Sequence, residues 1–233
     1  MDTPSIYLRD ILNENLEITE KSRMHNGIIY FRAISEVSEL PKKSAIRSDI
    51  IILAVGLYMI GFAAGVIMNL VAKPEADSFY EIMVERLRGE FEDIEGAFRI
   101  FTKILLHNLT ICAIMAFGGI VFTVPAAFIL LANGLPLGLV LARSEKPVLV
   151  FIGSILPHGL FEFPAIFLAG SFGILLGIDS FKLIWYWMKG EGEAPTRILL
   201  SDLRKVLKAF ILVVILLVVA AGIETLLFII YVE

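Results

Sequence analysis

The segment ILPHGLFEFPAI, residues 155 to 166, places an imidazole and a carboxylate inside a long apolar run. His158 and Glu162 are four residues apart, so a helix presents them on one face. Such a pair can share a divalent metal, relay a proton or cation, or form a salt bridge that stabilises a kinked helix. The metal interpretation rests on few ligands, because HExxH is absent and no cysteine ligand or second histidine lies nearby. All three chemistries stay open.

Three more polar side chains occur in apolar segments elsewhere: Asn108, Asn133 and Glu224. An ionisable group in the hydrocarbon of a membrane is costly unless it is paired or hydrated, so both glutamates are expected to face a bundle interior. We predict one buried polar cluster, which consists of Asn108, Asn133, His158, Glu162 and Glu224. Within it, His158, Glu162 and Glu224 are a carboxylate–imidazole set acceptable to a divalent metal such as zinc.

Each member of the predicted cluster also has a purely structural interpretation. Asn108 is compatible with an interfacial position, Asn133 with a helix cap, and Glu224 with a hydrated site near the membrane surface. His107 is a further residue within reach of the cluster, and the single cysteine, Cys112, is interpreted as a small packing residue. No Ser-His-Asp or Cys-His arrangement, P-loop or dinucleotide fingerprint occurs, so the catalytic residues, if any, are unknown.

The elements that must position these residues are transmembrane helices. Of the 233 residues, 58% are hydrophobic and only 19% are charged, and the mean hydropathy is +0.82. Charges gather in a few segments, as a bilayer requires, because about 20 consecutive apolar residues are needed to cross it. The sequence predicts an all-α polytopic helix bundle in a cell membrane. No basic stripe with interleaved aromatics occurs, so nucleic acid is not an expected partner.

The apolar segments predict two regions of chain. Residues 1–48 are expected to form a cytoplasmic, partly helical amino-terminal segment, and residues 49–233 a transmembrane domain. FTVP, around Pro125, is the expected turn inside a tract too long for one crossing. The five expected spans are about 50–72, 104–122, 126–142, 148–178 and 209–231.

Three local patterns add detail to these helices. Residues 73–103 repeat apolar side chains every three or four positions, which predicts an amphipathic surface helix running straight into the second span. Gly61 and Gly65 form a small-xxx-small face that suits either close packing within the chain or a dimer. The stretch LANGLPLG, residues 131–138, predicts an interrupted helix. Pro157 predicts the start of a new helix just before His158. One or two broken helices are therefore expected.

The positive-inside rule sets the expected orientation. The amino-terminal segment and the 179–208 connection carry most of the lysine and arginine, so both are expected in the cytoplasm. Five crossings then place the carboxyl terminus outside. The WYW stretch at 185–187 suits a membrane–water interface.

At the polar residues the chain resembles the stage II sporulation protein M family. The stretches that carry the resemblance are LLHNLTICAIMAFGGI with Asn108, LLANGLPLG, ILPHGLFEFPAIFLAGSFGILLG and AAGIETLL with Glu224. The resemblance covers roughly residues 50 to 231 and implies about five spans. In endospore-forming bacteria it implies a membrane partner of the cell-wall hydrolase machinery during engulfment; many relatives occur in archaea and in bacteria that make no spores.

Three functions are compatible with these features. The first is a non-enzymatic membrane component or partner-binding scaffold with a buried polar site, as the resemblance implies. The second is a transporter or channel for a small solute or ion, which buried carboxylates and broken helices favour. The third is an intramembrane metal-dependent hydrolase, against which the sparse ligand set counts. Besides the lipid bilayer, other membrane or envelope proteins and a second copy of the chain stay open as partners.

Overall fold

The computed structural model describes residues 48–91, 94, 96–190 and 193–232, all of which belong to one compact unit. Of the expected amino-terminal segment, residues 1–47, which include His25, lie outside the described residues. The described chain is built from helices and turns, with no strand among the described residues. The prediction of an all-α fold is confirmed.

Five helices are long and apolar enough to cross a membrane, and they fall in the five segments expected from the sequence. The turn at FTVP is confirmed, since a short 3₁₀ turn at Gly119–Val121 separates the second and third of these helices. The elements are α2 (Ser48–Val71), α3 (Lys73–Phe91), α4 (Ala97–Gly118), α5 (Val124–Arg143), α6 (Pro147–Val150), a π-helical turn (Phe151–Ile155), α7 (Leu156–Met188) and α8 (Glu193–Val232).

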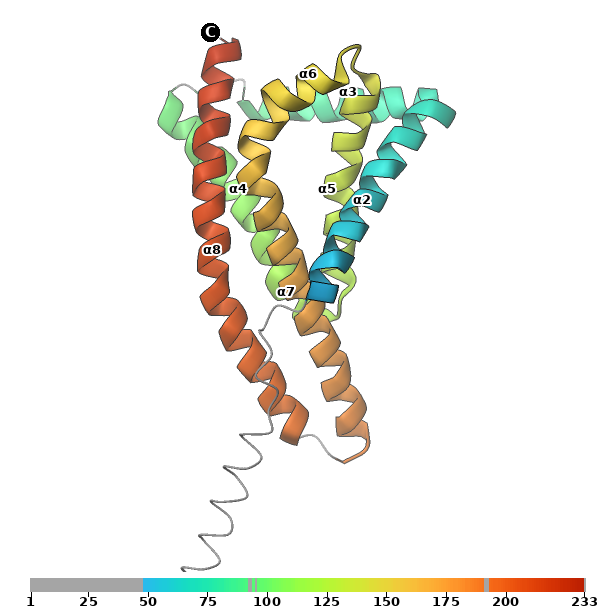
Figure 1. Cartoon of the computed structure of the whole chain (residues 1–233), viewed down its shortest axis with the longest axis vertical. Helices are drawn as coiled ribbons and strands as arrows, with labels where there is room; N and C mark the ends of the chain where they lie inside the picture. The colour runs from blue at the N-terminus through green and yellow to red at the C-terminus, as the bar shows by residue number, and fades with distance from the viewer. Residues whose placement is uncertain (1–47, 92–93, 95, 191–192, 233) are drawn as a thin grey trace, which may run out of the picture. The chain divides into compact units, whose positions relative to one another are not determined.

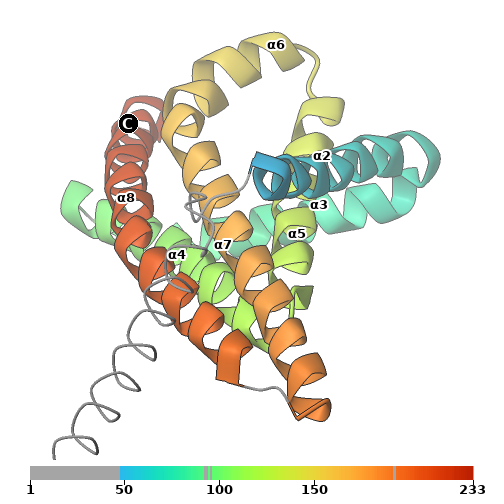
Figure 2. The ribbon, with the colours of Figure 1, turned by 60° about the horizontal axis from the view of Figure 1, so that its bottom comes forward.

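The bundle is organised around α7, which packs against each of the four other spanning helices. Figures 1 and 2 both show α7 between the pair α4–α8 and the pair α2–α5. From Ala165 to Gly177 every residue of α7 except Phe167 and Leu168 is buried, and Phe172 is 1% exposed. Phe172 joins Met115 of α4 and Leu217 of α8 in the main hydrophobic core.

Glycines bring α2 and α5 into backbone contact. A Cβ atom at Gly61 or Gly65 would collide with carbonyl oxygens of α5, and one at Gly134 or Gly138 would collide with carbonyl oxygens of α2. Only glycine permits so close an approach of two helices. The small-xxx-small face of the first span therefore serves packing within the chain.

The interruption expected at LANGLPLG is not observed. Helix α5 runs without a break from Val124 to Arg143 with Pro136 inside it. The Asn133 side chain donates a hydrogen bond to the Ile129 carbonyl in the preceding turn, 2.8 Å away. The two glycines of this stretch serve the contact with α2 described above, and this contact on both sides of Pro136 holds the helix together.

The amphipathic helix expected after the first span is present as α3, but it does not run straight into the second span. It ends at Phe91, and α4 begins after Gly96, whose φ of 93° lies in a region that non-glycine residues rarely adopt. Phe91 and Ile94 instead fold back to pack against Ile100 and Ile104 of α4. The expected continuous helix is therefore interrupted between Phe91 and Ala97.

Polar contacts attach α3 to the end of α5. Arg143 donates a hydrogen bond to the Asp77 carboxylate and also lies over the Tyr80 ring, 4.5 Å from its centroid. The hydrogen bond from Arg143 is the main reason that the pKa of Asp77 lies below its ordinary value of 3.8. The side chain of Asn69, at the end of α2, donates to the Ala142 carbonyl at 3.2 Å. These contacts fix α3 across the ends of two spans.

Candidate functional site

The local fold before His158 differs from a regular helix. The run Pro147–Met188 contains a π-helical turn at Phe151–Ile155, and α7 begins directly after it at Leu156. Pro157 is the second residue of α7, directly after the π turn, and the helical run from Pro147 to Met188 is continuous through it. The break and new helix start predicted at Pro157 are therefore replaced by a π turn within one helix, and π turns of this kind are frequent at functional sites.

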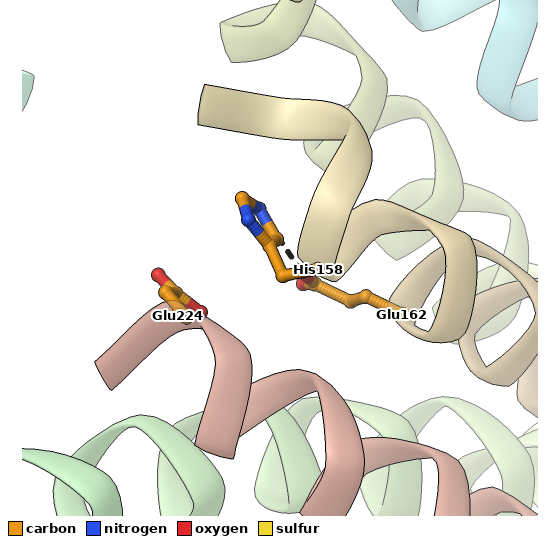
Figure 3. A group of neighbouring side chains, drawn as sticks. All are labelled: His158, Glu162 and Glu224. Carbon is orange, nitrogen blue, oxygen red and sulfur yellow. Dashed lines mark ion pairs between the residues drawn. The ribbon is translucent and has the colours of Figure 1, made fainter. Parts of the chain in front are cut away.

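The structure brings three of the five predicted cluster residues together. One ligand atom each from His158, Glu162 and Glu224 lies within 4.8 Å of the other two. The His158 Nε2 atom is 3.8 Å from the Glu162 Oε2 atom, across one turn of α7. Figure 3 shows Glu224 on α8 beside this pair. We call His158, Glu162 and Glu224 the α7–α8 triad.

The three side chains of the α7–α8 triad are partly buried. The side chains of His158 and Glu162 are 17% and 18% exposed, and Glu224 is half-buried. The Nδ1 atom of His158 is buried and forms no hydrogen bond of ordinary geometry with any described residue. A buried ring nitrogen of this kind normally has a partner, and the backbone of Ser154, one turn earlier, is the group that interacts with this imidazole.

The spacing of the triad fits a metal after small side-chain movements. Zinc lies about 2.0–2.2 Å from nitrogen and oxygen ligands in tetrahedral sites, so its ligand atoms are about 3.3 Å apart. The triad atoms need to approach one another by about 1.5 Å, which rotation about carboxylate and imidazole side-chain bonds supplies. The donor set of one nitrogen and two carboxylate oxygens is also acceptable to zinc.

The net charge of the triad also favours a divalent metal. Among the described residues, the only ion pair that includes a triad member is the one between His158 and Glu162. Two carboxylates and one protonated imidazole leave a net charge of −1, whereas two carboxylates, a neutral imidazole and a divalent cation sum to zero. In apolar surroundings the neutral combination is favoured. A second proton, held by a carboxylate, is the other way to neutralise the triad.

The inner wall of the site is apolar and aromatic. The Tyr58 ring of α2 makes edge contacts with Phe163 and Phe167 of α7, with centroids 5.9 and 5.4 Å apart. Tyr58 and the buried Cys112 of α4 lie within electrostatic range of Glu162. Sequence reasoning missed Tyr58, although its hydroxyl, the only one within the expected first span of residues 50–72, was a usable signal.

Asn108 and Asn133, the other two members of the predicted cluster, are not part of the α7–α8 triad. Asn133 bonds within α5, and its hydrogen bond to the Ile129 carbonyl agrees with a structural role. Asn108 is half-buried on α4, one turn before Cys112. The membership of both in the polar cluster stays a prediction. His107 is exposed on α4 and is not part of the α7–α8 triad.

Together, an all-helical bundle with five apolar helices and a polar triad between two of them define a multi-pass integral membrane protein. A family model described as Stage II sporulation protein M matches residues 50–227. The chain belongs to this family, as the resemblance in the sequence predicted.

Similarity to individual proteins extends to archaea. An uncharacterised protein of Methanocaldococcus jannaschii is 28% identical over 208 residues, which cover 84% of this chain and 91% of that protein. A second uncharacterised protein of the same organism is 28% identical over 127 residues, covering 53% of this chain and 68% of the relative. No solved structure matches the chain significantly.

Proposed function

We propose that this integral membrane protein is a non-enzymatic membrane component that binds a divalent metal, zinc in the first instance, at His158, Glu162 and Glu224. The observation that carries the proposal is the approach of ligand atoms from two helices to within 4.8 Å. A metal held there links α7 to α8, because Glu224 is the only ligand of the three that α8 contributes. The linked helices then serve as a rigid scaffold for other membrane or envelope proteins.

The surroundings of the triad favour a structural metal over a catalytic one. Three protein ligands leave the fourth position of tetrahedral zinc open, as in catalytic sites, but hydrolysis also needs a general base that is not itself a ligand. Here both carboxylates are used as ligands, and the further ionisable groups that interact with Glu162, Tyr58 and Cys112, are only 5% and 1% exposed. A hydrolase therefore lacks an accessible base at this position.

Transport of a proton or small cation is the second candidate, and a buried carboxylate favours it. Asp179 lies on α7 about 25 Å along the helix from Glu162, and its Oδ2 atom is buried without a hydrogen-bond partner among the described residues. Between the two carboxylates α7 is tightly packed, with Ile166 and Phe172 buried in the core. Passage would require α7 and α8 to move apart.

Metal content tests the first proposal. We expect purified protein, dialysed against micromolar zinc and then desalted, to retain one zinc per chain by elemental analysis. His158→Ala and Glu224→Gln are expected to reduce retained zinc at least tenfold. His107→Ala is the matched control, since it removes an exposed imidazole outside the triad. Equal zinc in wild type and in both triad variants, with unchanged elution from a sizing column, contradicts the proposal.

Ion flux tests the second candidate. A pH-sensitive dye inside proteoliposomes reports proton entry when a membrane potential is applied. A flux that Glu162→Gln abolishes, in protein that retains no zinc, supports transport and removes the structural metal. Absence of flux in wild type, together with stoichiometric zinc, supports the metal proposal.

The orientation forms part of the proposal, with the amino terminus in the cytoplasm and the carboxyl terminus outside. Cys112 is the single cysteine, so a Cys112→Ser background allows one new thiol to be placed at will. A thiol at Glu145→Cys, in the connection after α5, is expected to react with a membrane-impermeant maleimide added to intact cells. A thiol at Ser201→Cys on α8 is expected to react only after the cells are opened.

A further inference from the structure

The ends of α7 and α8 nearest their connection extend past the turn between α4 and α5. Gly173 packs against Gly119 at the start of this connection, and Gly177 packs against Thr123 at its end. Residues 178–188 of α7 therefore lie beyond the turn, over a length of about 16 Å. In Figure 1 this part of α7 and the start of α8 continue together below the other spanning helices.

Three consecutive aromatic residues lie near the end of this extension of α7. Trp185, Tyr186 and Trp187 are all exposed, and Trp187 is 74% exposed. Tryptophan and tyrosine are enriched where a membrane meets water, because one part of each ring system is apolar and another forms hydrogen bonds. The end of α7 is thus suited to the headgroup level of the leaflet on this side.

At the same end of the bundle, α8 carries a basic groove of about 380 Å³ lined by Arg197, Leu200, Ser201, Arg204, Lys205 and Lys208. None of the lining residues is acidic. Lys205 pairs with Asp202 at 2.6 Å, whereas Arg204 and Lys208 form no ion pair with any residue of 48–91, 94, 96–190 and 193–232. The groove therefore presents unneutralised positive charge together with a hydroxyl.

The charged face of α8 continues directly into an apolar one. Arg204 and Lys208 are followed at helical spacing by Ile211 and Ile215, which are 62% and 54% exposed. Opposite them, Val206 and Val213 are buried against the core. One exposed face of α8 thus changes from cationic to hydrocarbon-like over about two turns.

We propose that this face binds an anionic phospholipid, with the headgroup phosphate in the basic groove and an acyl chain along Ile211 and Ile215. Phosphate is complementary to the arginine, lysine and serine groups that line the groove. The apolar continuation distinguishes a lipid from a free phosphate ion, since a free ion makes no use of it. The site is separate from the α7–α8 triad and does not depend on the metal proposal.

The chain contains two tryptophans, Trp185 and Trp187, so its tryptophan fluorescence reports on this end of the bundle alone. The experiment uses the full-length protein in nanodiscs of phosphatidylcholine with a small fraction of lipid brominated near the headgroup. In one series the brominated lipid is phosphatidylglycerol, and in the other it is phosphatidylcholine. We expect brominated phosphatidylglycerol to quench at a many-fold lower fraction than brominated phosphatidylcholine.

Substitutions locate the effect. A basic residue at a lipid surface contributes about fivefold to anionic-lipid association, so Arg204→Gln with Lys208→Gln is expected to reduce the preference for phosphatidylglycerol about 25-fold. The control, Arg88→Gln with Lys146→Gln, removes the same charge from exposed positions outside the groove. The charge-preserving pair Arg204→Lys with Lys208→Arg is expected to retain most of the preference.

Three outcomes overturn the proposal. The first is equal quenching by the two brominated lipids in wild type. The second is an equal loss of preference in the control pair, which would make net charge alone responsible. The third is full suppression of the preference by millimolar glycerol phosphate, which would make the groove a site for a small anion.

Discussion

Zinc is expected to stabilise the folded protein through the link that it forms between α7 and α8. A ligand that binds only the folded state adds RT ln(1 + [L]/Kd) to the free energy of unfolding, which is about 2.7 kcal/mol at 100 times Kd. For a chain of this size, 1 kcal/mol corresponds to about 2–4 °C in the melting temperature. Saturating zinc is therefore expected to raise the melting temperature of wild type by about 5–10 °C.

Glu224→Gln removes the ligand that α8 contributes to the α7–α8 triad. If this loss weakens binding about 100-fold, the same zinc concentration equals Kd, and the added stability falls to about 0.4 kcal/mol. The shift then shrinks to about 1–2 °C, measured by light scattering or by tryptophan emission during heating in detergent.

Glu145→Gln removes an exposed carboxylate from the connection after α5 and is the control for this measurement. We expect the full wild-type shift in this variant, and magnesium in place of zinc is expected to give little shift with any of the three proteins. A Glu224→Gln protein that gains as many degrees as wild type would refute the argument that the metal joins the two helices.

Other regions give sharper tests of the fold. Gly138→Ala forces a Cβ atom against the α2 backbone and is expected to destabilise the protein by about 1–3 kcal/mol, whereas Gly56→Ala, with nothing within 4 Å, is expected to be neutral or slightly stabilising in thermal melts. Asp77→Asn is expected to speed amide hydrogen exchange in α3, because Arg143 loses its carboxylate partner. Since the pKa of Asp77 is lowered on folding, its contribution is present above about pH 4 and is lost as the pH falls below its ordinary value of 3.8. Cys112, 1% exposed, is expected to react with a maleimide only after denaturation; reaction in the native protein would contradict the packing around α4.

The number and placement of the spanning helices could be predicted from the sequence because the bilayer imposes a simple rule on length and polarity. The same rule does not determine where a spanning helix ends once it has left the membrane. The expected fourth span stopped at residue 178, whereas α7 continues to Met188, and α8 begins at Glu193 rather than near 209. These extensions pair with each other, and such pairing depends on tertiary contacts that local hydropathy does not report.

Glycine and proline show a second limit of sequence reasoning. Both the NGLPLG stretch of α5 and the SILPHG stretch at the start of α7 were expected to interrupt a helix. Only the second is irregular, with a π turn at Phe151–Ile155. In α5 the glycines serve a backbone contact with α2, and a helix so tightly packed tolerates Pro136. Whether a glycine breaks a helix or packs one depends on the partner, which no single stretch of sequence contains.

The polar residues could be predicted as a group for a related reason, and only up to a point. His158 and Glu162 share a helix, so their spacing alone placed them on one face. The approach of Glu224 followed from the cost of an isolated carboxylate in hydrocarbon. That cost does not apply to an asparagine, which can satisfy its amide within its own helix, as Asn133 does with the Ile129 carbonyl. The cost of burying a charged side chain thus predicted which residues lie close together better than the polarity of a side chain did.

The two proposed sites lie on the same pair of helices and act on it in different ways. At the α7–α8 triad, near one end, the proposed metal would draw together two carboxylates that otherwise repel each other. The basic groove lies near the other end, on α8 alone, where the proposed lipid would hold that helix to the leaflet. Between them, Phe172 of α7 and Val213 and Leu217 of α8 lie in the main hydrophobic core. The two proposals therefore concern different constraints: a metal at the triad would fix α8 relative to α7, whereas a lipid in the groove, on α8 alone, would fix α8 relative to the membrane.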